Sequence, residues 1–359
     1  MNESVLCADI GTTSLKAALL AKDGAVRAFC RIPIDGIAQY AKAFGTARHV
    51  LLSQAPAARI EGICISGNGP TVCTESGTGL MWNSDTREYD ERCASLNIRS
   101  RFIPKLLALK SLHPQAWSMA EWILGAPEQL IFSLTNHALA ILPNARFESA
   151  YWRAEDLRSA GFTDSDKQKL PPFAKPGSLA GHTAEGIPVF CGAPDYIAGT
   201  IGTNTLCPGA LFDRAGSSQG INLVTRIPVQ AEGLLTLPHF LPDLWNISCL
   251  IPDSGTLLHS DRERLLRKIC GGIERLQDAA RKAAQPCAER IATCGGQCSD
   301  NSWIQAKANA TRLRYLLPEC SDSELSGDAA LAWTALGAYS SVAQAARAMF
   351  RIKKEFTPK

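Results

Sequence analysis

An aspartate and a turn of glycine and hydroxyl residues separate the first two apolar segments of the chain. Residues 5–10 and 15–22 both have the composition of strands. The turn between them consists of Gly11, Thr12, Thr13 and Ser14. Backbone N–H groups and hydroxyls in such a turn can surround a phosphate, and the carboxylate of Asp9 can hold Mg²⁺, usually through waters. These residues therefore predict a site for a phosphate and a metal ion.

A second aspartate follows a later apolar strand. Residues 187–203 (IPVFCGAPDYIAGTIGT) break at glycine and proline, and Asp195 comes just past the break. Phosphoryl transfer needs positioning, charge neutralisation and a carboxylate that accepts the proton of the attacking hydroxyl. Asp195 is the candidate general base. Taken alone, it is also explained as the cap of a following helix.

The order of elements around the first turn argues against the two commonest phosphate-binding motifs. A Walker loop or a dinucleotide fingerprint requires a strand, a glycine-rich turn and then a helix. Residues 5–20 predict a strand, a turn and a second strand, and the chain contains no GxxxxGK[ST] sequence. The phosphate would therefore be held by a hairpin.

The elements that must position these residues alternate between strands and helices. Residues 25–34 predict a third strand, residues 37–54 a helix, and residues 59–69 a strand that runs into a glycine turn. Residues 97–135 are predicted to be mostly helical. The sequence is thus typical of a mixed α/β protein.

The second half of the chain echoes the first. Residues 211–224 (LFDRAGSSQGINLV) predict a strand, a Gly-Ser-Ser turn and a strand, as residues 5–20 do, which suggests a duplicated fold. Residues 262–284 predict a helix, residues 290–297 a strand ending in a double-glycine turn, and residues 327–349 a helix of small residues. No low-complexity linker separates the halves, so we place the boundary near residues 203–210.

Composition limits the class of partner. The chain has 359 residues, of which 46% are hydrophobic and 20% charged, with a formal net charge of +3, so two domains are expected. Without a long basic run, it offers no electrostatic surface for nucleic acid or an anionic membrane. No apolar run approaches the length of a membrane span, and the N-terminus enters a strand pattern, so we expect a cytoplasmic protein with a small-molecule partner.

Thirteen cysteines are scattered through the chain without paired CxxC clusters. Cys7, Cys64, Cys191 and Cys270 occupy apolar positions, so we interpret the cysteines as small buried hydrophobic residues. Cys294 and Cys298 form a close pair in sequence, and burial is again favoured there over metal or redox chemistry.

Seven segments together resemble those of the FGGY family of carbohydrate kinases, of the xylulokinase and glycerol kinase type. The segments are ADIGTTSLKAALLAKDGAV, ICISGNGPTVC, MWNSDTREYDERC, PKLLALKSLHPQAW with PEQLIFSLTN, PVFCGAPDYIAGTIG, AGSSQGINLV and CGGQCSDNSWIQAKANAT. In the family they correspond to the first phosphate motif, the Gly-Gln segment, the Trp-x-Asp-x-Arg segment, a helical stretch, the catalytic aspartate, the second phosphate motif and the adenosine segment. Their order along the chain makes the resemblance much more specific than any one of them.

The resemblance implies a fold and a division of labour. The fold is α/β, with two actin-like (ribonuclease H-like) domains of mixed sheets flanked by helices and a ligand cleft between them. Residues 1–205 would form an N-terminal sugar-binding and catalytic domain, and residues 206–359 a shortened C-terminal nucleotide-binding domain. The implied cofactors are ATP and Mg²⁺, and the implied activity is ATP-dependent phosphorylation of a sugar or polyol hydroxyl. The resemblance is also compatible with a homodimer.

Carried over residue by residue, the resemblance implies specific roles. Asp9 would lie near the metal, Thr12 and Thr13 near the transferred phosphate, and Asp195 would be the general base. Residues implied on the other side of the phosphates are Gly216, Ser217 and Ser218. The adenosine segment would use Gly295 and Gly296, with Asp300 or Asn301 nearby. Residues implied near the sugar pocket are Asn68, Trp82, Asp85 and Arg87.

The chain also departs from the family pattern. Family members are generally longer, and the shortfall is concentrated around residues 252–285 of the C-terminal half, where a Pro-Tyr-Leu and Gly-Glu-Arg pattern is missing. Asn68 replaces the glutamine of the Gly-Gln segment, and the Trp-x-Asp-x-Arg spacing is one residue wider. A degenerate protein that binds sugar or nucleotide without turnover, as a sensor or regulatory subunit, is the alternative function. A third alternative is an actin-like ATPase that acts on another substrate class.

Overall fold

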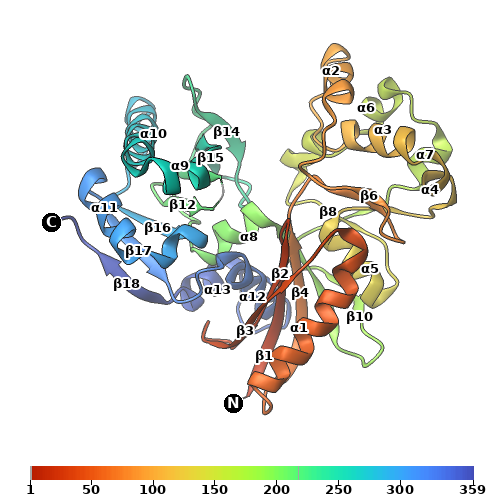
Figure 1. Cartoon of the computed structure of the whole chain (residues 1–359), viewed down its shortest axis with the longest axis horizontal. Helices are drawn as coiled ribbons and strands as arrows, with labels where there is room; N and C mark the ends of the chain where they lie inside the picture. The colour runs from red at the N-terminus through yellow and green to blue at the C-terminus, as the bar shows by residue number, and fades with distance from the viewer. Residues whose placement is uncertain (1, 217) are drawn as a thin grey trace. The chain divides into compact units, whose positions relative to one another are not determined.

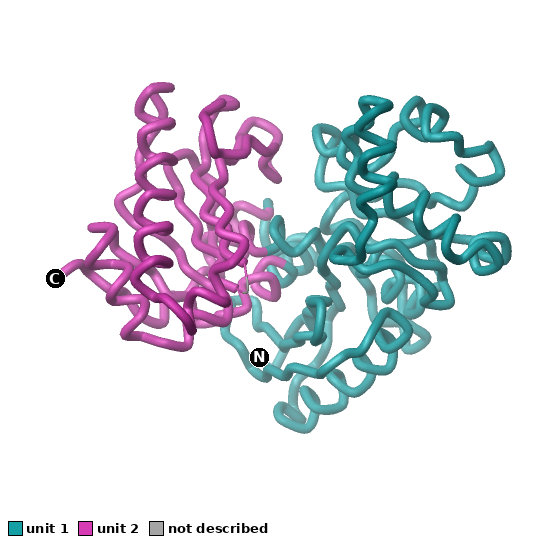
Figure 2. The backbone as a smooth tube through the Cα atoms, turned by 45° about the horizontal axis from the view of Figure 1, so that its top comes forward, with its two compact units in different colours: residues 1–198, 328–341 teal, residues 199–327, 342–359 magenta. Residues whose placement is uncertain are grey.

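The computed structural model describes residues 2–216 and 218–359. The backbone divides into two compact units, which Figure 2 shows in teal and magenta. Unit 1 comprises the residues up to 198 together with 328–341, and unit 2 comprises residues 199–327 and 342–359. Ser217 of the second predicted phosphate turn lies outside the described residues.

Unit 1 is built on a six-stranded mixed sheet in the order β10-β11-β4-β1-β2-β3 (Figure 1). Its strands are β1 (Glu3–Ile10), β2 (Ser14–Leu20), β3 (Val26–Pro33), β4 (Arg59–Gly67), β10 (Leu179–His182) and β11 (Pro188–Pro194). The three central strands β1, β4 and β11 run parallel, whereas β2 and β3 continue the sheet as antiparallel hairpins. The predicted strands at residues 5–10, 15–22 and 25–34 are confirmed.

Helices α1 (Tyr40–Gln54) and α5 (Ala126–Thr135) contribute to the apolar core of this sheet. Alternate residues of β1, namely Leu6, Ala8 and Ile10, belong to this core and are fully buried, as the two-residue period of a strand requires. The single-turn helix η1 (Ile37–Gln39) leads into α1. Together η1 and α1 account for the helix predicted over residues 37–54.

A second cluster of unit 1 gathers short helices around a small three-stranded sheet of β6, β5 and β7 (Figure 1). The strands are β5 (Val72–Thr74), β6 (Gly79–Leu80) and β7 (Ile123–Leu124), and the helices are α2 (Arg87–Ser95), α3 (Ile103–Leu112), α4 (Pro114–Met119), α6 (Ala154–Ala160) and α7 (Asp164–Gln168). The two-stranded sheet of β8 (Ala140–Ile141) and β9 (Phe173–Ala174) and the 3₁₀ helix η2 (Ala145–Ala150) complete the unit. Residues 97–135 are indeed mostly helical, but β7 interrupts them.

Unit 2 has a seven-stranded sheet in the order β14-β15-β13-β12-β16-β17-β18. Its strands are β12 (Leu211–Ala215), β13 (Gln219–Thr225), β14 (Leu235–Pro238), β15 (Trp245–Ile251), β16 (Arg290–Cys294), β17 (Arg314–Pro318) and β18 (Ile352–Phe356). The helices that begin or lie in this half are α8 (Asp195–Gly202), α9 (Ser254–Ser260), α10 (Arg262–Lys282), η3 (Gly296–Ser299), α11 (Asn301–Thr311), α12 (Ser323–Ala335) and α13 (Val342–Met349).

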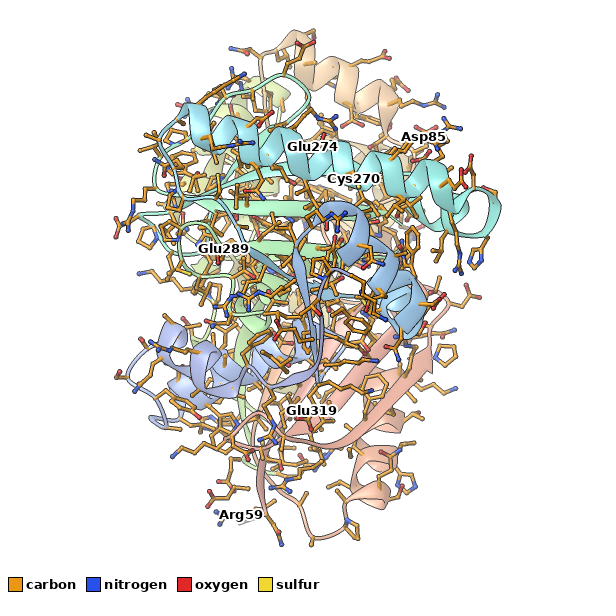
Figure 3. All side chains as sticks on the ribbon, turned by 90° about the vertical axis from the view of Figure 1, so that its left-hand side faces the viewer. Arg59, Asp85, Cys270, Glu274, Glu289 and Glu319 are labelled. Atoms are coloured by element: carbon orange, nitrogen blue, oxygen red, sulfur yellow. The ribbon has the colours of Figure 1, made fainter. Side chains whose placement is uncertain are left out.

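Helix α10 forms where residues 262–284 predict it. Asp261 caps it, because its carboxylate accepts a hydrogen bond from the backbone of Arg264 at 2.9 Å. Leu265, Ile269 and Leu276 lie on one face and are fully buried in the core of unit 2. Cys270 and Glu274 lie one turn apart on the same helix (Figure 3). Cys270 is half-buried, and burial raises the pKa of its thiol, with a further rise from the Glu274 charge.

The two large sheets repeat one strand order. In unit 1 the chain order β1, β2, β3, β4, β11 gives the spatial order β3-β2-β1-β4-β11. In unit 2 the strands β12, β13, β15, β16, β17 give β15-β13-β12-β16-β17, with the same parallel and antiparallel pairings. The duplication suggested by the sequence is therefore present in the topology.

Two expectations about individual segments are corrected. The helix predicted over residues 327–349 is interrupted between α12 and α13, and Gly337 there has a φ of +77°, a conformation that ends helices. Most of the cysteines are buried, but Cys207 and Cys287 are exposed. Among the residues that the structure describes, no helix is long and apolar enough to cross a bilayer.

Candidate functional site

Three predicted site segments begin at one edge of the sheet of unit 1. The last residues of its parallel strands are in register, with Ile10 beside Gly67 and Gly67 beside Pro194. The next residues along each strand are therefore Gly11, Asn68 and Asp195. Since neighbouring strands are about 4.8 Å apart, the backbones of the first turn and of Asp195 are on the order of 10 Å apart.

The first predicted phosphate turn is a tight connection between β1 and β2. The backbone N–H of Gly11 donates to the carbonyl of Ser14 at 3.0 Å, and the carbonyl of Thr13 accepts from Ile34. A Cβ at Gly11 would lie 3.0 Å from the Ser14 carbonyl oxygen. The turn is partly exposed, as a phosphate-binding loop must be.

Asp9 is buried at the centre of the sheet. Its register partners are Lys16 on β2 and Ser66 on β4, so all three side chains stand on one face. The Lys16 ammonium lies 3.2 Å from one carboxylate oxygen, and the Ser66 hydroxyl donates to the other at 3.2 Å. The carboxylate is thus held by a cation and a hydroxyl.

Two hydrogen bonds tie the segment after β4 back to the end of β1 and the first turn, and two more hold the segment together. The backbone of Asn68 donates to the Ile10 carbonyl at 2.9 Å, and the Thr71 hydroxyl donates to the Asn68 amide oxygen at 3.1 Å. The backbone of Trp82 donates to the Thr71 hydroxyl, and its indole N–H donates to Thr12 Oγ1 at 2.8 Å. The structure therefore brings two predicted sugar-pocket residues against the predicted phosphate turn.

Asp195 is the first residue of α8, directly after β11. Its Oδ1 accepts a hydrogen bond from the backbone N–H of Tyr196 at 2.6 Å. The position is that of a residue at a helix N-terminus, where the positive end of the helix dipole favours a carboxylate. A capping role and a role as proton acceptor are both compatible with this placement, and the carboxylate is only partly buried.

In unit 2, the second turn and the double-glycine segment follow adjacent parallel strands. Arg214 on β12 is in register with Cys294 on β16. The Gly216 backbone donates to the Ser218 carbonyl at 3.1 Å. Gly295 has a φ of +98°, and a Cβ there would lie 2.6 Å from the Ala215 carbonyl oxygen. The two segments are in contact, and the contact requires glycine.

Comparison with solved structures gives strong matches over the whole chain. A ligand-bound xylulose kinase from Lactobacillus acidophilus matches with a TM-score of 0.77 at 15% identity, covering 99% of this chain and 94% of its own. A gluconate kinase from the same organism has a TM-score of 0.76 at 16% identity, with the same coverage. A Plasmodium falciparum glycerol kinase with ADP has a TM-score of 0.78 at 14% identity, again over 99% and 94%. The chain has the fold of the FGGY-type carbohydrate kinases.

At these identities the likeness establishes the FGGY-type fold and nothing finer. A scan against models of known protein families finds no match, and a search of curated proteins finds none either. The expected α/β fold with mixed sheets flanked by helices is confirmed. The roles of individual residues must therefore be argued from this chain's own geometry.

Sequence reasoning missed Gln297, which in this FGGY-type fold joins the two segments of unit 2. Its side-chain amide donates to the Gly216 carbonyl at 2.7 Å, and its oxygen accepts from the Trp303 indole at 3.3 Å. Gln297 is 5% exposed. The sequence feature that could have pointed to Gln297 is its position directly after the double glycine. Gln297 keeps the carbonyl of the second turn directed into the protein.

A buried ion pair lies beneath the second turn. Lys307 and Asp213 are both fully buried, with their charged atoms 2.7 Å apart. Thr293 and Gln219 donate to the two oxygens of the same carboxylate at 3.0 and 2.6 Å. The network ties β12, β13, β16 and α11 together directly below Gly216.

The remaining predicted residues have structural partners of their own. Asp300 caps α11 through the backbones of Ser302 and Trp303 and lies 3.0 Å from Arg262. The hydrogen bond that the Ser302 hydroxyl donates to Asp300, followed by that of the Trp303 backbone, holds the pKa of Asp300 below its usual range. Asn301 is the exposed first residue of α11, and Gly296 begins η3. The Asp300 carboxylate is thus already used to cap α11 and to pair with Arg262.

Asp85 and Arg87 are exposed and form an ion pair with each other at 2.7 Å. The hydrogen bonds from Arg87 lower the pKa of Asp85 to about 2. In the described part of the chain, no hydrogen bond joins this pair to Asn68 or Trp82. These two predicted sugar-pocket residues are therefore paired with each other and, among the described residues, not hydrogen-bonded to the other two.

No cluster of three or more metal-ligating side chains occurs among residues 2–216 and 218–359. A single carboxylate that is already paired with an ammonium suits a hydrated Mg²⁺ held through waters, because this ion keeps much of its hydration shell. Asp9 therefore fits an outer-sphere role and not an all-protein metal cage.

Proposed function

We propose that this protein transfers the γ-phosphoryl group of ATP to a hydroxyl of a sugar or polyol. The observation that carries the proposal is the row of Gly11, Asn68 and Asp195 at the carboxyl edge of β1, β4 and β11. In this proposal, the first turn donates hydrogen bonds to a phosphate, the Asn68 amide binds the acceptor molecule, and the Asp195 carboxylate accepts the proton of the acceptor hydroxyl. Neighbours of the same fold are a ligand-bound xylulose kinase and a glycerol kinase with ADP, which supports this assignment.

The division of roles follows the chain. We propose that residues 1–205 bind the acceptor and supply the base, and that residues 206–359 bind the nucleotide. The first turn, Gly11 to Ser14, would donate to the transferred phosphoryl group. The second turn, Gly216 to Ser218, and the glycines at 295 and 296 would hold the rest of the nucleotide through backbone groups.

In the proposed reaction, an acceptor hydroxyl attacks the γ-phosphorus of ATP. A new oxygen–phosphorus bond forms, the bond between the γ-phosphorus and the bridging oxygen breaks, and ADP leaves with that electron pair. Asp195 accepts the proton of the attacking hydroxyl. When bound with the nucleotide, Mg²⁺ would supply charge neutralisation; Asp9 would hold it through waters, and Lys16 would face the phosphate oxygens.

The acceptor site centres on the amide of Asn68. Its Nδ2 is buried, with no hydrogen-bond partner among the described residues. A buried amide donor without a partner is costly, and a hydroxyl oxygen of a bound ligand would satisfy it. Asp85 and Arg87, in contrast, are exposed and already paired with each other. We therefore propose that Asn68 contributes more to acceptor affinity than either of them.

The test is a screen for ADP release over pentuloses, hexuloses, aldonates and polyols, with the purified protein and with Asp195→Asn. Turnover on one class is expected. In the variant, kcat should fall by about 10²–10⁴, the usual effect of removing a general base, while nucleotide affinity stays nearly unchanged. Near-normal turnover by Asp195→Asn would remove the base assignment.

The same screen addresses the alternative function. If no acceptor supports turnover while calorimetry still detects binding of ATP or of a sugar, the protein is a sensor or a regulatory subunit. If neither binds, the proposed kinase function is wrong.

A further inference from the structure

The hydrogen bond between Trp82 and Thr12 joins residues that lie 70 positions apart. It also joins two predicted sites, because Thr12 belongs to the phosphate turn and Trp82 to a segment expected to contact sugar. We propose that Trp82 is a positioning residue that orients the Thr12 hydroxyl toward a nucleotide phosphate. This inference rests on the proposed function, and it assigns Trp82 to the phosphate side of the reaction.

The loop that carries Trp82 is fixed at Trp82 itself and two residues later. The Trp82 backbone donates to Thr71 Oγ1 at 3.2 Å. Two residues later, the Ser84 carbonyl accepts from the Lys105 ammonium at 3.2 Å. Lys105 is 4% exposed, and burial lowers the pKa of its ammonium. Although Trp82 is 45% exposed, its backbone is held by these contacts and its indole by the hydrogen bond to Thr12.

The hydrogen bonds close a ring that begins and ends at the first turn. It runs from the Ile10 carbonyl to Asn68, from Asn68 to Thr71, from Thr71 to Trp82 and from Trp82 to Thr12. Thr71 is fully buried and accepts from the Trp82 backbone, so its single hydrogen goes to the Asn68 oxygen. The Nδ2 group of Asn68 is therefore available to donate a hydrogen bond to a ligand.

The chemistry of a hydroxyl explains why the indole orients Thr12. A threonine hydroxyl has one hydrogen to donate and two lone pairs. Once a lone pair accepts from the indole, the hydrogen must point away from Trp82. A phosphate oxygen is an acceptor, so a hydroxyl fixed in this way is ready to donate to it without losing rotational freedom on binding.

The first test observes the hydrogen bond itself, without activity. The indole N–H signals of ¹⁵N-labelled protein are recorded, and the Trp82 signal is identified by its loss in Trp82→Phe. Thr12→Val, which keeps the branched shape and removes the hydroxyl, should shift that signal and speed its exchange with solvent. Thr12→Ser should restore the wild-type signal. An unmoved signal in Thr12→Val would overturn the inference.

The second test measures affinity for Mg²⁺ with adenosine 5′-(β,γ-imido)triphosphate, a non-hydrolysable ATP analogue. Trp82→Phe and Thr12→Val should each weaken binding about three- to tenfold, the range for one hydrogen bond. The double variant should be no weaker than Thr12→Val alone, because the indole acts through that hydroxyl. Trp122→Phe is the matched control, since no described residue accepts from the Trp122 indole, and it should bind as the wild type does.

The outcomes separate this inference from the proposed function. Wild-type protein that binds the analogue while Trp82→Phe binds it equally well would overturn the positioning role. Additive losses in the double variant would show that Trp82 affects nucleotide affinity independently of the Thr12 hydroxyl, which would also overturn the positioning role. Wild-type protein that does not bind the analogue would overturn the proposed nucleotide site, and with it the phosphate that Thr12 is proposed to meet.

Discussion

At the scale of single residues, the carboxylate of Asp9 is shared by a cation and a hydroxyl. Lys16 and Ser66 reach its two oxygens from the neighbouring strands. A hydrated Mg²⁺ beside Asp9 would find its charge partly balanced by the Lys16 ammonium. The carboxylate is therefore suited to orienting the waters of the ion and not to binding it tightly in the absence of nucleotide.

Asp9→Asn keeps the shape of the side chain and an oxygen for Ser66, but removes the charge. The Mg²⁺ concentration for half-maximal turnover should rise by about tenfold or more, because Lys16 then repels the cation without compensation. Magnesium titrations of ADP release at saturating ATP would measure the change. Asp35→Asn makes the same substitution at an exposed position and should titrate as the wild type does. An unchanged titration in Asp9→Asn would refute the metal assignment.

Residue identity alone could not reveal how the predicted side chains pair. Asp85 and Arg87 fit a sugar-pocket pattern, yet two residues of separation on an exposed loop let them form an ion pair with each other. Thr12 and Trp82 are 70 positions apart, so their contact depends on where two loops end in space. Gln297 follows a predicted segment directly, but its role depends on a carbonyl of another strand.

At the scale of elements, a buried glutamate joins a helix to a strand in unit 1. Glu128 lies in the first turn of α5, and its Oε1 accepts from the backbone of Ile141 in β8 at 2.9 Å. Only 7% of Glu128 is exposed, and burial raises its pKa to about 7. The folded state therefore favours the protonated carboxyl.

This shift predicts a loss of stability as pH rises. The folded pKa of about 7 is above the unfolded value of 4.5, so the stabilisation is complete below pH 4.5 and is lost as pH rises through 7. The full effect is about 3 kcal/mol of unfolding free energy. Glu128→Gln keeps an oxygen for Ile141 and carries no charge, so its stability should depend less on pH. Urea unfolding at pH 5 and pH 8 would measure the difference.

The exposed Glu121→Gln serves as the control for this substitution. It should retain the wild-type loss of stability between pH 5 and pH 8. Equal pH dependence in Glu128→Gln and the wild type would show that Glu128 does not titrate in this range.

Strands with strong local patterns were predictable, and short ones were not. The strands β1, β2, β3 and β4 are long apolar runs bounded by turn residues, and the sequence predicts each of them. The strands β6 and β7 have two residues each, which is too short for any periodicity. The division of residues 327–349 into two helices depends on Gly337, whose neighbours are otherwise good helix formers.

At the scale of the whole molecule, the segments of unit 2 that we propose to bind the nucleotide offer few side chains for recognising a base. Asp300 is occupied as the cap of α11 and by Arg262, and the second turn and the glycine segment present mainly backbone groups. Backbone N–H groups in such turns bind phosphate oxygens, which are the same in every nucleoside triphosphate. The proposed kinase should therefore discriminate weakly between donors.

We expect ATP and GTP to differ in kcat/KM by less than about tenfold, or 1.4 kcal/mol. Steady-state kinetics with ATP, GTP and ITP on the best acceptor would measure the ratio. A preference for ATP above about a hundredfold would contradict the expectation and show that other residues form an adenine pocket. ITP is the informative third donor, because its base lacks the exocyclic amino group of guanine.

The repeated strand order has a consequence for how the two halves diverged. Two positions before the glycine of each turn, the first sheet carries Asp9 and the second carries Arg214. Each is matched by a neutralising partner: Lys16 beside Asp9, and Glu324 at 3.0 Å from Arg214. Equivalent positions of the repeated strand order therefore carry opposite charge. If the proposed function holds, this difference would suit the first copy to a cation and the second to an anion.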